Sequence, residues 1–400
     1  MSSVPGSPSS NPSWFDRWIF DAFPVDAAGL GLYRIGVALF SLLILTPGYG
    51  GLQFDSVASL PDALYLPPPG PMQWVSGFPS PLVFDVLHGA LYLSLTALLF
   101  GYRTRIASIA TTLLLLIGSG WFFSAGKVNH TMLFVLLPLV MAFSNWGAAF
   151  SLDARLRNRS DTSPVASWPL TLAALLTGFA MFTAGLPKIL GGWLDPSTQA
   201  VQSRVIDQFF VHERQDLLAP VALRLDAPWL WEMLDWATVL FEVGFLIAIL
   251  YPLSTRLFAA GAVLFHTGVM LIMNIAFLPN LPIYAAFLPW SRIARALRPH
   301  VDALRPRLSM WSIGGLFCGT ALFFGTVGSP LHWLDAAVPF QSGLTLMDVV
   351  GMGIALGVVV GMGIASLSRW LVRSRGTHVS REPPLVPRDT PREKSELNPH

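Results

Sequence analysis

Long runs of apolar residues alternate with short polar segments along most of the chain. Each run approaches the 18 to 25 residues, roughly, that a helix needs to cross a hydrocarbon core about 30 Å thick. The pattern predicts an all-α, polytopic membrane protein with about ten transmembrane helices, at residues 27–46, 82–100, 105–125, 131–147, 168–190, 229–250, 256–274, 276–290, 309–328 and 345–370. The 276–290 run is short and interrupted by prolines. A re-entrant segment is its alternative interpretation, and this would reverse the side on which the C-terminal tail lies.

The same pattern divides the chain into four parts. We expect a polar N-terminal segment at 1–26, a membrane domain at 27–295, two additional transmembrane helices at 296–370 and a disordered tail at 371–400. No basic residue precedes Arg17, and no small-residue cleavage site follows a short apolar core. We therefore interpret the first apolar run as a membrane anchor and not as a signal peptide.

The long loop at 194–228 contains a further periodic pattern. Its apolar residues recur at helical spacing, at Val201, Val205, Ile206, Phe209 and Phe210. This spacing predicts a helix outside the membrane spans. The helix either lies in the membrane interface or packs as an ordinary loop helix, and the pattern favours neither.

Composition and charge narrow the classes of function. The chain is 53% hydrophobic and 12% charged, against about 25% charged for soluble domains. Its formal net charge of +2 gives no reason to expect a nucleic-acid partner, and its single cysteine excludes an intrachain disulfide and a thiolate zinc cluster. Arginines gather in alternate loops, so the positive-inside rule places both termini in the cytoplasm. The expected location is the plasma membrane, and the Arg, Ala, Gly and Pro usage points to a bacterium.

Ionisable residues inside membrane spans are costly, and each one is a candidate functional residue. Arg34, in the first span, and Glu242, in the sixth, are expected at the same depth from the cytoplasmic side. Equal depth and opposite charge suggest that they form a structural ion pair.

A second set of polar residues is expected in the outer half of the membrane. It comprises Asp85, His88, Asn129, His130, Lys188, Glu232, Asp235 and His266. Each has a structural interpretation: His88 as a hydrogen-bonded helix contact, for example, and nearby Asp195 as the cap of a turn. Together they suggest a substrate pocket. His130, His266 and a carboxylate could in principle bind zinc or iron. They lack a recognisable ligand spacing, so we predict no metal.

Lys188 is one of only three lysines in the chain and ends a long apolar run. A lysine amine can lose its proton when it is buried, whereas arginine stays protonated. Lys188 is therefore a candidate general base. The alternative is a lysine whose ammonium extends past Pro187 to the membrane surface.

Four stretches, in order, resemble the vitamin K-dependent gamma-carboxylases and the wider HTTM (horizontally transferred transmembrane domain) family. They are "LFGYRTRIAS", "KVNHTMLFVLLPLVMAFSNWGAAFSLDARL", "AGLPKILGGW" and "FHTGVMLIMNIAFLPNLPIYAAFLPW". The start of the first span, "YRIGVALF", also fits, so the resemblance covers roughly 27–295. It includes an A-G-x-x-K-x-x-x-x-W segment, in which Lys188 is the lysine and Trp193 the tryptophan.

The resemblance implies an activity. It assigns Lys188 as the base that deprotonates a reduced naphthoquinone, such as reduced vitamin K or menaquinone, which O2 then converts to an epoxide. His130 and His266 match histidines at or near the active centre. With Asn129 and Trp193 from the matching motifs, and Asp235 and His88 from the polar layer described above, they complete the expected pocket. Carboxylation of a secreted peptide with CO2 would follow. However, the chain has two further spans where the carboxylases have a large extracytoplasmic domain, and Pro187 replaces a second lysine of the animal enzymes.

Two other functions remain open from the sequence. One is a non-enzymatic membrane partner for the maturation or export of a secreted peptide. The other is a small-solute or proton-coupled transporter that uses the polar layer as a pathway. A transporter would be expected to show inverted repeats with paired broken helices, and the sequence shows neither.

Overall fold

The computed structural model describes residues 12–45, 57–58, 60–124, 131–157, 164–304, 309–327 and 340–376. These residues form helices and no strands, as expected for an all-α membrane protein. The contacts divide the chain into two units, Met1–Leu356 and Gly357–His400. The site described below lies entirely within the first unit.

Among the described residues, seven helices are long and apolar enough to cross a membrane. They are α2 (Ala27–Phe40) with the π-helical turn that continues it (Ser41–Leu45), α3 (Pro81–Phe100), α4 (Thr104–Phe123), α7 (Trp168–Leu190), α11 (Pro252–Met273), α14 (Met310–Val327) and α16 (Leu346–Gly376), of which Leu346–Ser366 is the apolar part. Leucine, isoleucine and phenylalanine side chains are exposed along them, for example Phe179 and Leu257. A lipid environment explains this exposure, because such side chains are normally buried in soluble proteins.

Three of the expected spans differ from this set. Helix α10 (Pro228–Ala248) is long enough to cross, but it contains three acidic residues. Helix α5 (Met132–Met141) covers only ten residues of the run at 131–147. The 276–290 run is not one spanning helix: it forms a 3₁₀ turn, η6 (Leu278–Asn280), and the five-residue helix α12 (Leu281–Ala285). Its prolines lack the N–H groups that a continuous helix needs.

The remaining helices are short or lie outside the apolar runs. They are α1 (Trp14–Asp21), α6 (Leu152–Leu156), α8 (Ala200–Phe210), α9 (Ala219–Leu223), α13 (Trp290–Leu304) and two short 3₁₀ turns, η4 (Asp62–Leu64) and η5 (Pro71–Trp74). Helix α1 was not predicted. Ser13 caps it, and the Trp18 indole donates a hydrogen bond to the carbonyl of Ile249, which follows α10.

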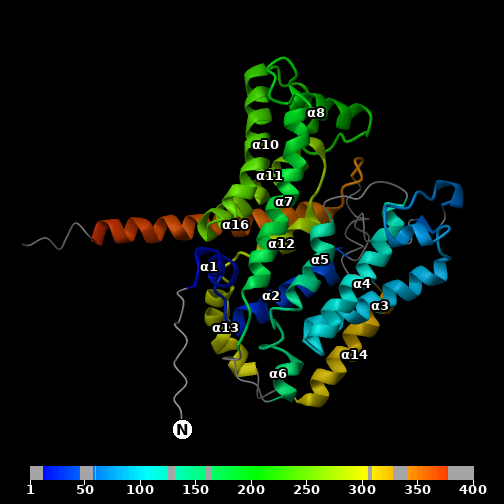
Figure 1. Ribbon diagram of the computed structural model, residues 1–400, viewed down its shortest axis with the longest axis vertical. Helices are drawn as coiled ribbons and strands as arrows, with labels where there is room; N and C mark the ends of the chain where they lie inside the picture. Colours follow the sequence, from blue (N-terminus) through cyan, green and yellow to red (C-terminus); the bar gives the residue numbers. More distant parts are fainter. Residues whose placement is uncertain are drawn as a thin grey trace, which may run out of the picture. The chain divides into compact units, whose positions relative to one another are not determined.

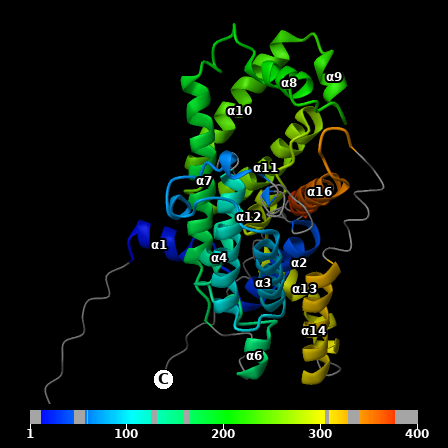
Figure 2. The same ribbon diagram turned by 90° about the vertical axis from the view of Figure 1, so that its right-hand side faces the viewer.

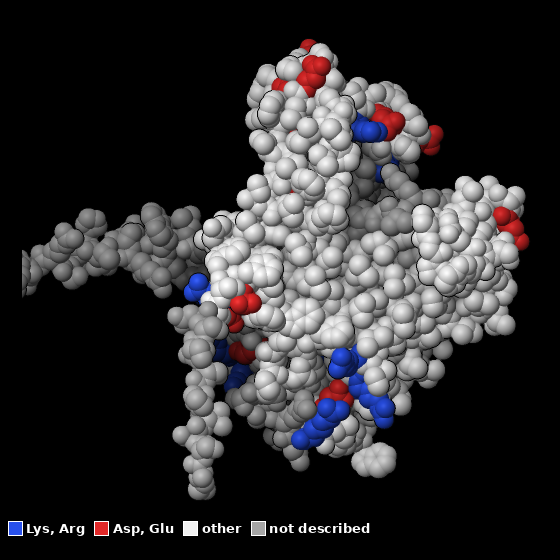
Figure 3. All heavy atoms as spheres, viewed as in Figure 1, with Lys and Arg blue, Asp and Glu red and all other residues white. Residues whose placement is uncertain are grey.

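Helices α7 and α10 pack along one another, and α8 contacts the first part of α10 (Figures 1 and 2). The predicted loop helix is α8. Its Val201 and Val205 are buried in a cluster with Ala222 and Trp231, so one face packs against the protein, whereas Ile206 and Phe210 are exposed. On the face shown in Figure 3, charged side chains gather around α1 and α6 and again around α8, and the surface between them carries almost no charge. This distribution is typical of a membrane protein.

Candidate functional site

The site is built where α7 and α10 approach closely. Glycines Gly178 and Gly185 lie two turns apart on α7, both in contact with α10. A Cβ atom at Gly185 would lie 3.0 Å from the Glu242 Cβ atom, and one at Gly178 would lie 2.9 Å from the Ile249 Cγ2 atom. These neighbours also show that the helices are staggered. The two helices run in opposite directions, and the first part of α10 extends roughly two turns past the end of α7.

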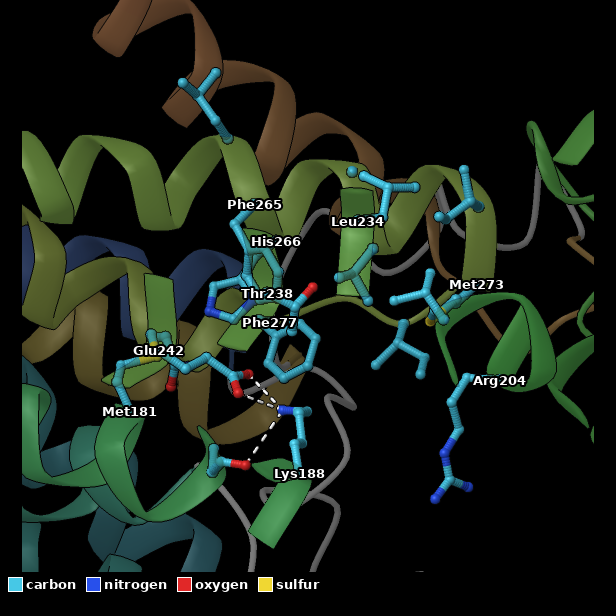
Figure 4. A pocket seen from close by; sticks show the side chains of 18 of the residues that line it. Met181, Lys188, Arg204, Leu234, Thr238, Glu242, Phe265, His266, Met273 and Phe277 are labelled. Carbon is cyan, nitrogen blue, oxygen red and sulfur yellow. Dashed lines mark hydrogen bonds and ion pairs between the residues drawn. The ribbon is translucent and has the colours of Figure 1, made fainter. Parts of the chain in front are cut away.

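The stagger brings Lys188, near the end of α7, beside Glu242, in the middle of α10. The Lys188 Nζ atom donates to both carboxylate oxygens, at 2.6 Å and 2.5 Å, and to the Ala184 carbonyl at 3.3 Å (Figure 4). The Glu242 side chain is 6% exposed and the Lys188 side chain 22% exposed. Lys188 therefore does not extend freely to the surface, because its ammonium is held by a largely buried carboxylate.

Trp193 completes the surroundings of the ammonium. The chain turns back after α7, and the backbone N–H group of Trp193 donates to the Lys188 carbonyl at 3.0 Å. Its ring centroid then lies 5.2 Å from the Lys188 Nζ atom, within the range of a cation–π interaction. The structure thus gives a role to each residue in the A-G-x-x-K-x-x-x-x-W segment. Ala184 accepts a hydrogen bond from the lysine, Gly185 allows the helices to approach, and Trp193 covers the ammonium.

A cavity of about 760 Å³ adjoins this pair. Its volume is in the range of ligand-binding pockets, roughly 300 to 1,000 Å³. Most of its wall is apolar, and polar groups enter it from four directions: Lys188 from α7, Glu242 and Thr238 from α10, His266 from α11, and Arg204 and Gln208 from α8. Trp193 and Asn280 also line it. The cavity can therefore hold an apolar ring and offer hydrogen bonds at its edges.

His266 is buried at this cavity, as the sequence led us to expect. Its Nε2 atom lies 2.9 Å from the hydroxyl of Tyr284, on α12. The imidazole stacks on the Phe277 ring with centroids 4.1 Å apart. Two helices and the segment between them thus fix the orientation of the ring.

The expected ion pair between Arg34 and Glu242 is wrong. Arg34 is fully buried and donates to three backbone carbonyls: Leu98 at 2.5 Å, Leu99 at 3.1 Å and Phe150 at 2.5 Å. The first two belong to the last turn of α3, where free carbonyls favour a cation. Arg34 is therefore a structural residue that joins α2 to the end of α3, and Glu242 is neutralised by Lys188 instead.

The other predicted pocket residues have different outcomes. Asp235 does not line the cavity. Its buried carboxylate accepts from the N–H groups of Ala200 and Val201, at 2.8 Å and 2.6 Å, and so caps the start of α8. His88, on α3, is also absent from the cavity wall. Asn129 and His130 lie outside the described residues.

Asp195, which follows Trp193, caps a turn. Its carboxylate accepts hydrogen bonds from the Ser197 N–H group, at 3.0 Å, and from the Ser197 hydroxyl, at 2.8 Å. These two bonds hold the pKa of Asp195 below its usual value. Within the described part of the chain, no group of three or more His, Cys, Asp or Glu residues is placed to hold a metal ion.

The sequence did not predict five of the polar residues now seen at or beside the cavity: Arg204, Gln208, Thr238, Asn280 and Tyr284. Asn280 and Tyr284 lie in the proline-rich "LPNLPIY" stretch, which the hydrophobic pattern places inside a membrane span. An amide and a phenol inside such an apolar run were the features from which these two residues could have been predicted as part of a polar site.

A comparison with protein families matches the HTTM domain over residues 23–290, more than half of the chain. No curated protein and no solved structure matches the chain. The matched region contains every residue of the cavity wall.

Proposed function

The chain belongs to the HTTM domain family, and we propose that it is a gamma-carboxylase-like enzyme that oxidises or epoxidises a lipid-soluble hydroquinone, with Lys188 as the general base. The observation that carries the proposal is the amine–carboxylate pair in the wall of a mainly apolar cavity. An apolar ring dissolved in the bilayer suits such a cavity, and the pair supplies a group that can exchange a proton.

The contact between Lys188 and Glu242 explains how a lysine can act as a base. When the shared proton moves to the carboxylate, the Lys188 amine becomes neutral and can accept a proton from a hydroquinone hydroxyl. The Trp193 ring then stabilises the ammonium that forms. An arginine at this position would keep the ion pair but could not give up its proton.

The hydroquinone anion that results is the species that O2 oxidises. In the epoxidation, one oxygen atom of O2 enters the quinone ring as the epoxide. The other leaves as water with the two hydrogens of the hydroquinone. Carboxylation of a secreted peptide, with CO2 as a further substrate, would be an additional step driven by the same chemistry.

The test is an aerobic assay of purified protein in nanodiscs. Reduced menaquinone and reduced vitamin K are supplied, and the epoxide is measured by mass spectrometry. We expect epoxide from the wild type and a loss of about a hundredfold or more in Lys188→Arg. We also expect Glu242→Gln, which removes the acceptor of the shared proton, to lose epoxide formation. Glu232→Gln is its matched control and should keep it, because Glu232 lies on the same helix and outside the cavity wall.

Two other outcomes would contradict parts of the proposal. Epoxide formation that survives Lys188→Arg would exclude Lys188 as the base. No epoxide from folded wild type with either quinone would contradict the enzyme and favour a membrane partner for a secreted peptide.

A further inference from the structure

A second polar group lies at the cavity, on different elements from Lys188 and Glu242. Asn280 ends the 3₁₀ turn η6 and lines the cavity, although only 2% of it is exposed. Tyr284, one turn further along in α12, has its hydroxyl 2.9 Å from the His266 Nε2 atom. Asn280, Tyr284 and His266 therefore form a polar cluster at the α11–α12 side of the cavity.

One atom in this cluster has no partner. The side-chain oxygen of Asn280 is buried and accepts no hydrogen bond in the structure. A buried acceptor without a donor costs about 1 to 3 kcal/mol, so such an atom calls for an explanation. Asn280 lines the cavity, so a bound ligand is the group that can supply the missing partner. The missing group must be a hydrogen-bond donor.

We infer that Asn280 selects the reduced form of the ring, by accepting a hydrogen bond from a second hydroxyl group of the ligand. This inference rests on the proposed function for the class of ligand. A para-dihydroxy ring has hydroxyls on opposite edges: the first faces Lys188 and Glu242, and the second donates to Asn280. The oxidised quinone has only acceptors at these edges, so it leaves the Asn280 oxygen unpaired. Asn280 is a specificity residue, and no proton transfer is assigned to it.

Anaerobic binding tests the inference without any turnover. The probes are 2-methyl-1,4-dihydroxynaphthalene, its 4-O-methyl ether and the corresponding quinone, titrated by calorimetry into wild-type protein in nanodiscs. We expect the dihydroxy probe to bind about tenfold more tightly than either of the others, the effect of one hydrogen bond. In Asn280→Leu, which keeps a similar volume, we expect all three probes to bind within about threefold of one another.

If Asn280→Leu does not fold, the affinities of the wild type for the three probes still test the role of Asn280. Equal affinity of the wild type for the three probes would overturn the role of Asn280 and leave the proposed function intact. The same holds if Asn280→Leu keeps the wild-type preference. A preference for the dihydroxy probe without epoxide formation would support the inference and contradict the proposed epoxidation. If no probe binds, both fail.

Discussion

The Nζ atom of Lys188 lies 2.6 and 2.5 Å from the two carboxylate oxygens of Glu242, and this pair joins the end of α7 to the middle of α10. Removing one partner leaves the other charge buried and uncompensated, which usually costs about 3 to 5 kcal/mol. The Lys188 side chain is 22% exposed, so the pair is not fully buried. We therefore expect Lys188→Met or Glu242→Leu to lower the free energy of unfolding by less, about 2 to 3 kcal/mol.

The double variant distinguishes an ion pair from two independent contacts. Lys188→Met with Glu242→Leu removes both charges together, so we expect it to be less destabilised than the sum of the single variants. Thermal unfolding in one detergent measures all four proteins. Additive losses would show that the two side chains are not coupled.

Arg34 should act independently of Glu242. Since Arg34 donates to carbonyls at the end of α3, we expect Arg34→Met to lower the free energy of unfolding by about 2 to 4 kcal/mol, because those carbonyls lose a buried donor. Combining it with Glu242→Gln should give the sum of the two effects. Arg157→Met is the control, since Arg157 is exposed, and it should change stability by about 0.5 kcal/mol or less. Rescue of Arg34→Met by Glu242→Gln would instead show that Arg34 and Glu242 form an ion pair in the wild type.

Gly185 sets the distance between α7 and α10. A Cβ atom there would lie 2.9 Å from the Val243 Cγ2 atom, so Gly185→Ala forces a shift of the neighbouring α10 side chains or of the helix itself. We expect a loss of about 1 to 3 kcal/mol in the free energy of unfolding. Any epoxidase activity should fall as well, because the Lys188–Glu242 contact lengthens. Gly89→Ala, in α3, is the matched control: a Cβ atom there meets nothing within 4 Å, so the higher helix propensity of alanine should leave stability unchanged or raised. Equal effects of the two substitutions would contradict the close contact.

Asp235 should hold α8 in place, although it does not line the cavity. Asp235→Ala leaves the first two N–H groups of α8 without their acceptor, and loss of a helix cap costs about 1 kcal/mol. We expect faster proteolytic cleavage within Ala200–Phe210 of this variant, with the remaining helices protected. Asp235→Asn keeps one side-chain oxygen and should be cleaved at an intermediate rate. Unchanged cleavage in Asp235→Ala would show that packing of Val201 and Val205 is sufficient.

The sequence predicted most of the membrane helices and singled out Lys188 and His266, because apolar runs and rare ionisable residues are visible in a single chain. Trp193 was expected only from the resemblance to the A-G-x-x-K-x-x-x-x-W segment of the family. It did not predict the partner of Lys188. Depth was estimated by assuming that all spans begin at the same level, which placed Glu242 far from Lys188 and level with Arg34. The stagger between α7 and α10 depends on the contacts of Gly178 and Gly185, and the hydrophobic pattern carries no information about it.

The broken 276–290 segment shows a different limit. Its prolines predicted an interruption, and the structure has a 3₁₀ turn followed by a short helix. The interruption places Asn280 and Tyr284 at the cavity, however, and this depends on tertiary packing. Residue type alone could not distinguish an amide that contacts a ligand from one that caps a turn.

The pair of Lys188 and Glu242 has a consequence for the charge balance of the cavity. Because the protein supplies both the cation and the anion, the pair is electroneutral whether the proton lies on the amine or on the carboxylate. A neutral molecule can therefore enter from the bilayer and give up a proton while the total charge within the cavity does not change. No counter-ion has to follow it from water, and no net charge crosses the electric field of the membrane. Catalysis at such a site would be insensitive to the membrane potential.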